Sequence, residues 1–214
     1  GKIFPQNKTP VFAADLRYVV IRPYWDAPRS IIVNELLPSI RANPAWLVRN
    51  HFEIVQGDSD TSPVLAPSPE SIAAVERGAA RLRQRPGPDN SLGNFKFLFP
   101  NRYNVYLHDT PARGLFARAQ RAASHGCVRV EDPRALANQL LANEPGWTDA
   151  AERSAKIDTA LAKTMPTRVT LKRPVRVFLM YATALAIEDG RVLFFDDIYG
   201  HDAKLVQALG SAHN

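Results

Sequence analysis

The sequence predicts an α+β domain that is mainly β, with helices at the periphery and a mostly helical insert. Apolar and polar residues alternate at 12–23 and again after residue 94, as in strands that bury one face. Between these strands, residues 27–81 change to capped helical segments and loops. Such a stretch is typical of an inserted subdomain, so we expect a core domain built from residues 1–26 and 82–214.

The composition is that of a globular protein with a core of ordinary size. The chain has 214 residues, of which 45% are hydrophobic and 22% charged. No apolar run approaches the roughly 18 residues that a membrane span requires. The chain begins at Gly1 without a charged-then-apolar signal segment, so we interpret it as part of a longer chain.

The first strand, at 12–23, leads into the insert. Asn34 can cap one helix there, and Asn43-Pro44 begins a second, shorter one. Residues 57–63 are rich in Gly, Ser, Asp and Pro and are predicted to form a loop. Ser68, followed by proline and glutamate, opens a third helix.

Two strands, at 94–99 and 104–108, follow the insert. Thr110 is a suitable N-cap for a helix that continues to Ala123, because apolar residues recur along one face. A turn and short strand at 124–130 then carry the single cysteine of the chain. The remaining elements are expected in this order: a helix opened by Asp132-Pro133, a helix from Thr148 to near Thr164, strands at 168–171 and 175–186, a hairpin turn at Asp189-Gly190 into a strand at 192–195, and a terminal helix at 202–209.

Cys127, the single cysteine, lies in the segment Ser124-His125-Gly126-Cys127-Val128-Arg129, and His108 precedes it. A lone cysteine is in general a small buried hydrophobe, but with a histidine elsewhere in the chain it is a candidate nucleophile. The thiolate is the attacking form, so a cysteine with a pKa near about 8.5 needs a base or a positive charge close by. Gly126 lets the backbone bend sharply and leaves amide donors free to face a carbonyl.

The order of these residues resembles the signature of the L,D-transpeptidases (the YkuD-type catalytic domain), in which cysteine is the acylated nucleophile. Fifteen residues separate His108 from Ser124. The resemblance covers about residues 15–200 and points to the large Gram-negative branch of the family, which carries an inserted lid. Further segments that carry it are Ile21–Trp25, Arg83–Asn90, Lys96–Asn101, Tyr106–Pro111 and Leu115–Ala119.

The resemblance implies a YkuD-like β-sandwich catalytic domain, with residues 27–81 as the lid. In the family, strands precede the segment that begins here at Gly1. Without them the sheet would have an unpaired edge, and such an edge invites pairing with another chain. We therefore expect either a domain that tolerates their loss or a partner chain that completes the sheet.

The resemblance also implies roles for the site residues. Cys127 would be the nucleophile and His108 the base. Asp109 would orient His108, through either its carboxylate or its backbone carbonyl, or would merely belong to the turn. The amides of Gly126 and Cys127 are candidates for an oxyanion hole, and His125 would shape the site, together with Ser124 of the same motif.

Three further residues are candidates for substrate contact. Arg129 lies two residues after Cys127, where it would lower the thiol pKa or hold a substrate carboxylate, unless it pairs with Glu131. Tyr106 lies two residues before His108, on the same face of the strand. Trp25 ends the first strand and would either stack over the cleft or belong to the core.

Neither a metal nor a cofactor is implied. The chain has no paired Cys-x-x-Cys and no His-Glu-x-x-His motif. Its net charge is +6, but the 27 basic residues are scattered and do not alternate with aromatic residues as in a nucleic-acid platform. Acidic peptidoglycan stems fit the positive charge equally well.

The resemblance implies a periplasmic enzyme that forms 3→3 peptidoglycan cross-links through a cysteine thioester and is acylated by carbapenem β-lactams. The acceptor stays open: a stem amine gives a transpeptidase, water an L,D-carboxypeptidase, and a lipoprotein lysine an anchoring enzyme. Two alternatives from other classes are an inactive cell-wall-binding protein and a basic nucleic-acid binder. Acylation of Cys127 tests the first, and salt-dependent affinity for DNA or RNA tests the second.

Overall fold

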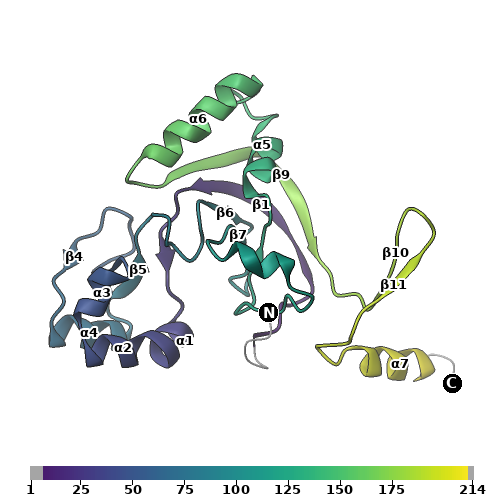
Figure 1. Ribbon diagram of the computed structural model, residues 1–214, viewed down its shortest axis with the longest axis horizontal. Helices are drawn as coiled ribbons and strands as arrows, with labels where there is room; N and C mark the ends of the chain where they lie inside the picture. The colour runs from purple at the N-terminus through teal and green to yellow at the C-terminus, as the bar shows by residue number, and fades with distance from the viewer. Residues whose placement is uncertain (1–6, 212–214) are drawn as a thin grey trace.

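The computed structural model describes residues 7–211 and is centred on a five-stranded sheet (Figure 1). Neighbouring strands are antiparallel except for β7 and β8, which are parallel. The strands follow the order β8-β7-β6-β1-β9, with β1 at Phe12–Ile21, β6 at Phe95–Leu98, β7 at Leu107–His108, β8 at Val128–Arg129 and β9 at Thr167–Leu179.

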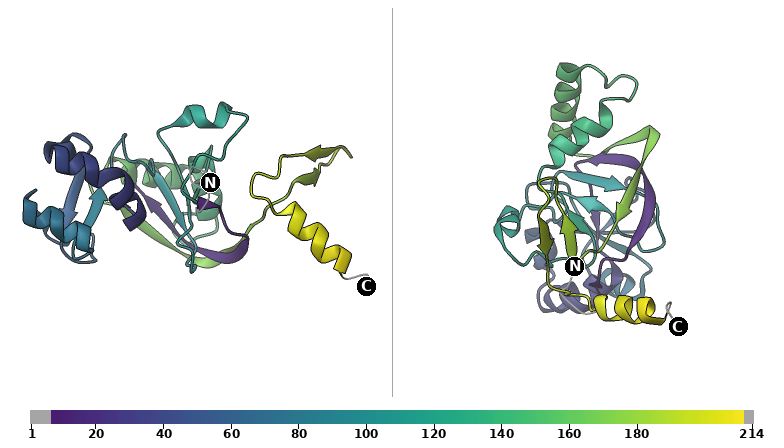
Figure 2. Two further views of the ribbon diagram at one scale, coloured as in Figure 1. Left: turned by 90° about the horizontal axis from the view of Figure 1, so that it is seen from below. Right: turned by 90° about the vertical axis from the view of Figure 1, so that its right-hand side faces the viewer.

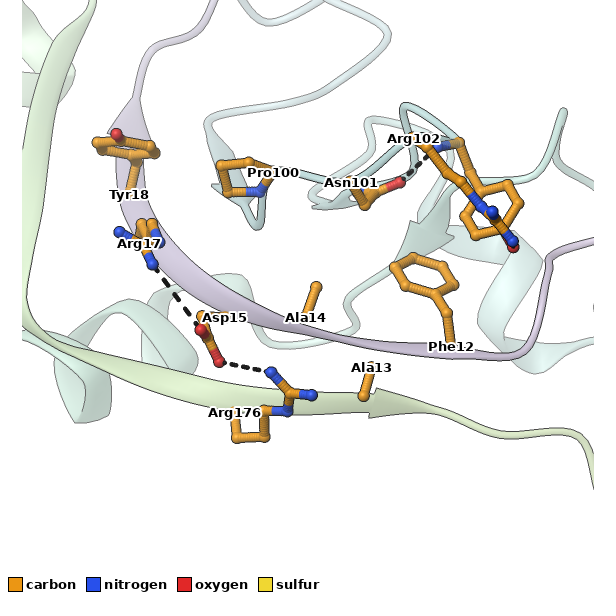
Figure 3. Close-up of a pocket in the computed structure, with 11 residues that line it drawn as sticks. Phe12, Ala13, Ala14, Asp15, Arg17, Tyr18, Pro100, Asn101, Arg102 and Arg176 are labelled. Carbon is orange, nitrogen blue, oxygen red and sulfur yellow. Dashed lines mark hydrogen bonds and ion pairs between the residues drawn. The ribbon is translucent and has the colours of Figure 1, made fainter.

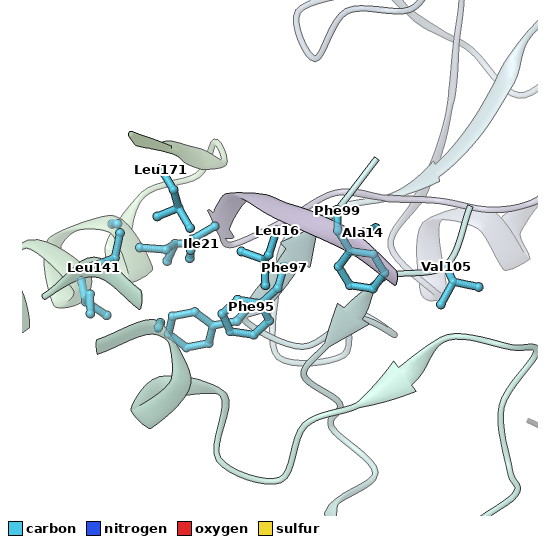
Figure 4. Packing of buried hydrophobic residues seen from close by; sticks show 13 residues of the cluster. Ala14, Leu16, Ile21, Phe95, Phe97, Phe99, Val105, Leu141 and Leu171 are labelled. Atoms are coloured by element: carbon cyan, nitrogen blue, oxygen red, sulfur yellow. The ribbon is translucent and has the colours of Figure 1, made fainter. Parts of the chain in front are cut away.

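Helices α5 (Pro133–Leu141) and α6 (Ala150–Ala162) pack on one face of this sheet and enclose the main core. Asp132 and Asp149 cap these helices through their carboxylates, which accept from the backbone amides three residues later. Each fully buried aliphatic or aromatic side chain contributes roughly 1.5–3 kcal/mol. The largest of them are Leu16, Ile21, Phe97, Phe99, Leu141 and Ile157 (Figure 4).

The insert has a sheet and a buried cluster of its own. Its sheet has the order β2-β5-β3-β4, and its helical segments begin with a continuous run that includes a π-helical stretch. Its elements are β2 (Trp25–Asp26), α1 (Arg29–Ile31), η2 (Ile32–Leu36), α2 (Leu37–Ala42), α3 (Ala45–Arg49), β3 (Phe52–Val55), β4 (Val64–Leu65), α4 (Pro69–Arg77) and β5 (Arg81–Gln84). The buried cluster is built from Ile32, Leu37, Ile40, Leu47, Ile54, Val75 and Leu82, among others.

A C-terminal hairpin, β10 (Ala184–Ala186) with β11 (Val192–Phe194), and helix α7 (Asp202–Ser211) follow β9. Figure 2 shows this segment and the insert at opposite ends of the central sheet. Several of its large apolar side chains are exposed, including Phe194 at 79% and Val206 at 69%. No helix within residues 7–211 combines the length and the apolar character needed to cross a bilayer.

The α+β class is confirmed, and so are the helices opened by Pro44, Ser68, Asp132 and the 148–149 region. The expected cap at Asn34 is wrong, because the helical run already begins at Arg29. Ile31 and Ile32 are buried, so packing extends the helix towards its N-terminus past the position that capping alone favours.

The helix expected from Thr110 to Ala123 is also wrong. Only a 3-10 turn, η3 (Arg113–Ala117), forms there. The Thr110 hydroxyl accepts from Ala112 N at 3.2 Å and closes a tight turn, which competes with a helix. Leu115 and Phe116 line a cavity instead of packing into a core, so their apolar pattern does not indicate a buried helical face.

The two strands expected at 168–171 and 175–186 are instead one strand, β9, which ends at Leu179. Its pairing with β1 shifts register where Leu16 gives way to Tyr18. The buried carboxylate of Glu144 accepts from the backbone amides of Lys172 at 2.9 Å and Arg173 at 3.5 Å. These hydrogen bonds keep β9 continuous at residues 172–174, where the sequence predicts a break between two strands.

The edge of β1 opposite β9 is paired with β6 only at residues 18–21. Among the residues that the structure describes, no strand pairs with that edge at residues 12–17. A cavity of about 760 Å³ lies there, between Phe12 and the 100–103 loop, with Arg17 and Arg176 bonded to Asp15 beside it (Figure 3). An unpaired edge was expected, and the partner chain that would cover it stays a prediction.

Candidate active site

The candidate site lies on the face of the central sheet opposite α5 and α6. In the β6–β7 register Lys96 pairs with His108, and in the β7–β8 register His108 pairs with Arg129. Directly opposed residues share a face, and so do residues two apart in one strand. Tyr106 and Cys127 therefore join this face one step along β7 and β8, where Val128 N donates to Tyr106 O at 3.2 Å.

The motif around Cys127 is held by hydrogen bonds on both sides of Gly126. Gly126 has φ +120°, a conformation that favours glycine, and its carbonyl accepts from Thr9 Oγ1 at 2.9 Å. Its amide donates to the buried Ser124 hydroxyl at 3.2 Å. The Gly126 amide is thus engaged by Ser124 in this structure, and its expected oxyanion role stays a prediction. The Cys127 amide makes no hydrogen bond within residues 7–211 and keeps its donor free.

The Cys127 thiol is half-buried beside Tyr106. Burial raises the pKa of the thiol, and this outweighs the hydrogen bonds from Tyr106 and the charge of Lys96, which lower it. Arg129 was expected either to lower the thiol pKa or to hold a substrate carboxylate; its charge does interact favourably with Cys127, but burial dominates the net shift. The resting form at neutral pH is the thiol, and a base must remove its proton during reaction.

His108 is suited to that task. Its ring is buried, and burial lowers its pKa to about 4, with smaller contributions from the charges of Arg129 and Lys96. The imidazole is thus neutral at pH 7. Its Nδ1 bonds to the backbone carbonyl of Asp109, which fixes the tautomer and leaves the lone pair on Nε2.

Asp109 acts on His108 through its backbone carbonyl, and its carboxylate points elsewhere. The carboxylate accepts from the amides of Asn94 at 2.8 Å and Thr110 at 2.7 Å. A Cβ built on Gly93 would lie 2.4 Å from this carboxylate, so only glycine fits there. Asp109 is therefore an anchor of the loop before β6 as well as the orienting partner of the histidine.

Trp25 and Tyr106 form the wall of the site that faces the insert. Burial is the main reason that the pKa of Tyr106 is raised, with smaller contributions from Cys127, which raises it, and from the Trp25 side chain, which lowers it. The Trp25 ring also contacts Phe52 edge-on, with 5.8 Å between ring centres. Trp25 thus packs on the cluster of the insert, and its expected stacking over the cleft stays a prediction.

His125 is bonded to the insert. Its Nε2 lies 2.7 Å from Oε1 of Glu35, in the π-helical segment of the insert. Arg129 donates from Nη1 to Ala123 O at 2.7 Å, and its buried Nε has no partner in the described part of the chain. An ion pair between Arg129 and Glu131 is not formed there.

Sequence reasoning missed three residues of the site. Lys96 interrupts the apolar run Phe95–Phe99. A charged residue at that position of a strand indicates a polar face, so the sequence pattern alone could have identified Lys96. Asn104 has φ +53°, and its backbone carbonyl oxygen lies 3.9 Å from Cys127 Sγ. This contact depends on the backbone conformation, so the residue type does not predict it. Glu35 lies 90 residues before its partner, so only the fold reveals the contact.

A cavity of about 740 Å³ opens beside Cys127 on the side of the C-terminal segment. Its walls are mostly apolar and come from Leu115, Phe116, Phe178, Met180 and Tyr199, among others. No group of three or more metal-binding side chains occurs within residues 7–211. The arrangement provides a neutral base, a thiol and a free amide donor, a set suited to acyl transfer through a thioester.

Comparisons with known proteins agree with this chemistry. The L,D-transpeptidase catalytic domain (YkuD) matches residues 1–177. A Haemophilus influenzae protein described as "Putative L,D-transpeptidase" is 39% identical over 199 residues, which cover 93% of this chain. The chain spans 39% of the length of that relative.

Proposed function

Because the chain belongs to the L,D-transpeptidase catalytic-domain family, we propose that it catalyses acyl transfer on peptidoglycan stem peptides in the periplasm, with Cys127 as nucleophile. The observation that carries this proposal is the neutral imidazole of His108, fixed by the Asp109 carbonyl on the face that carries the thiol. No cofactor takes part.

In the proposed first half-reaction, Cys127 attacks the carbonyl that joins the third residue of a tetrapeptide stem to its terminal D-alanine. Nε2 of His108 takes the thiol proton as the carbon–sulfur bond forms. The imidazolium then gives this proton to the amine of D-alanine as the carbon–nitrogen bond breaks. A thioester remains, and His108 is neutral again. The free amide of Cys127 is the donor that stabilises the oxyanion.

In the second half-reaction, the side-chain amine of another stem attacks the thioester and forms the 3→3 cross-link. His108 takes a proton from this amine and returns it to the departing sulfur, which restores the thiol. Water at the same step gives an L,D-carboxypeptidase, and a lipoprotein lysine gives an anchoring reaction. We propose residues 27–81 as a lid, supported by the Glu35–His125 contact, which joins the insert to the nucleophile loop.

Intact-mass analysis after incubation with a carbapenem tests the nucleophile. We expect a mass increase of one inhibitor in the native protein and none in Cys127→Ala. An unmodified native protein would favour the inactive cell-wall-binding alternative, and an adduct that persists in Cys127→Ala would place the nucleophile elsewhere. Mass spectrometry of products from a disaccharide-tetrapeptide then identifies the acceptor as stem amine or water.

A further inference from the structure

One row of the central sheet carries four basic side chains. The register joins Arg168 of β9 to Val20 of β1, Val20 to Lys96 of β6, Lys96 to His108 of β7, and His108 to Arg129 of β8. Because opposed residues share a face, the row runs across all five strands on the face that holds Cys127. Four strand spacings span about 19 Å.

Three of these side chains are cations that are not neutralised. Lys96, Arg129 and Arg168 form no ion pair with any carboxylate of residues 7–211. Elsewhere the fold does neutralise such groups: Arg176, also on β9, lies 3.0 Å from the carboxylate of Asp15. The exposed Lys172 and Arg173 of β9 also have no ion pair in the described part of the chain, so what distinguishes this row is that Lys96 and Arg129 are half-buried.

Lys96 is the informative member, because it is half-buried. Burial is the main cause that lowers its pKa, so its ammonium is held at a cost. The charge of Asp26 offsets only part of this cost, because its carboxylate is bonded to Arg81 at 2.5 Å and forms no ion pair with Lys96. A half-buried ammonium without an ion-pair partner indicates that a bound ligand supplies the negative charge.

Aromatic rings hold two of the cations in position. Lys96 Nζ lies 4.2 Å from the centre of the Tyr106 ring, and the Arg168 guanidinium lies 3.8 Å from that of Tyr18. These contacts orient the cations but leave donors free. Arg129 adds its buried Nε, which has no partner within residues 7–211.

We propose that Lys96 and Arg168 extend Arg129 into a carboxylate-binding row that holds the acidic donor peptide across the strands. This inference rests on the proposed function. An extended peptide advances about 3.4 Å per residue, so a tetrapeptide covers about 14 Å of the row, and the long side chains at its two ends reach over the remaining length. Carboxylates of the peptide would meet Lys96 and Arg168 while its reacting carbonyl lies at Cys127.

The test compares a tetrapeptide stem with free carboxylates and the same stem with its side-chain carboxylates amidated. We expect native protein to show a KM at least about tenfold lower for the free acid, because each carboxylate accepts charge-assisted hydrogen bonds. In Lys96→Met and in Arg168→Gln this preference should shrink towards one. Arg173→Gln, an exposed change on the same strand but outside the row, is the matched control and should keep the preference.

Binding to Cys127→Ala separates this proposal from the proposed function. If native protein transfers acyl groups but Arg168→Gln keeps the preference for the free acid, the carboxylate-binding proposal is wrong and the proposed function is unaffected. Suppose instead that native protein transfers no acyl group, but Cys127→Ala binds the free acid in preference to the amidated stem. If adding Arg168→Gln to Cys127→Ala removes this preference, the carboxylate-binding row is supported and the proposed reaction is not. Arg168 is exposed, so this variant decides the matter even if Lys96→Met fails to fold.

Discussion

In the insert, Arg83 is 2% exposed and lies 2.7 Å from the carboxylate of Glu53, so a buried cation is fully neutralised. In the central sheet, the half-buried Lys96 has no carboxylate partner in the described part of the chain. The Cys127 thiol and the His108 imidazole beside it are likewise buried in their neutral forms. The buried cation of the insert is therefore neutralised within the insert, whereas the half-buried Lys96 on the site face of the sheet has no such partner in the described part of the chain. This difference locates function in the sheet and assigns the insert a supporting role.

The largest effect should come from the nucleophile of the sheet. Cys127→Ser should lower acyl transfer by at least about 10³-fold, because an alkoxide is far harder to form near neutral pH than a thiolate. The thermal unfolding midpoint should change little, since the two side chains differ by one atom. Product analysis by mass spectrometry measures the rate. Comparable turnover by the serine variant would contradict the thiolate mechanism.

The next effect separates the two histidines. His108→Ala should slow β-lactam acylation on the order of 10²- to 10⁴-fold through loss of the base. His125→Ala should cost far less, because its ring is bonded to Glu35 of the insert. Circular dichroism confirms that both variants are folded. The reverse ranking would exchange their roles.

His108 also predicts a pH dependence. Its pKa is lowered to about 4 in the folded protein, below the value of about 6.5 in the unfolded chain, so the unfolded state binds the proton first as pH falls. Stability contributed by this group is therefore complete above about pH 6.5 and is lost between there and pH 4. The acid limb of kcat/KM should lie near pH 4. If the acid limb of kcat/KM instead lies near pH 6.5 and disappears in His108→Gln, the His108 ring is not desolvated.

These predictions also mark how far the sequence leads. Helices with a strong cap and a regular apolar face, such as those after Ser68 and Asp132, are visible from local residues alone. The four short strands of the insert were missed, because β2 pairs with β5 across more than fifty residues and no local pattern encodes that partner. The nucleophile Cys127 and the base His108 were assigned from the resemblance of the motif to the L,D-transpeptidase signature, and both assignments stay predictions.

The finer parts of the site depend on register and backbone geometry. The row from Arg168 to Arg129 exists only once five strands are aligned. The choice between the carbonyl and the carboxylate of Asp109 depends on a loop whose glycine, Gly93, leaves room for the carboxylate. Neither feature is a property of residue types in order, so sequence reasoning left them open.

The insert should show its own sensitivity when its buried ion pair is broken. Glu53→Gln leaves Arg83 buried and uncompensated, and we expect local destabilisation of about 3–5 kcal/mol. Hydrogen exchange should accelerate in β3 and β5, while β6 of the central sheet stays protected. Glu76→Gln removes an exposed ion pair with Arg41 in the same insert and serves as control, with an effect below about 1 kcal/mol. Equal acceleration in β6 would show that the two regions unfold as one unit.

The smallest expected effect tests the link between the two regions. Glu35→Ala removes the bond to His125 and should reduce β-lactam acylation by roughly threefold to tenfold, the size of a single hydrogen bond. Asp58→Ala, in an exposed loop of the insert, is the control and should have no effect.

If residues 27–81 act as a lid, acylation of Cys127 should slow hydrogen exchange in the insert of the native protein, because a closed lid excludes water from the thioester. In Glu35→Ala this slowing should weaken, since the insert is no longer tied to the loop that carries the nucleophile. Exchange in the insert that is unchanged by acylation would mean that the segment is ordinary core, and the contact between Glu35 and His125 would then be structural alone.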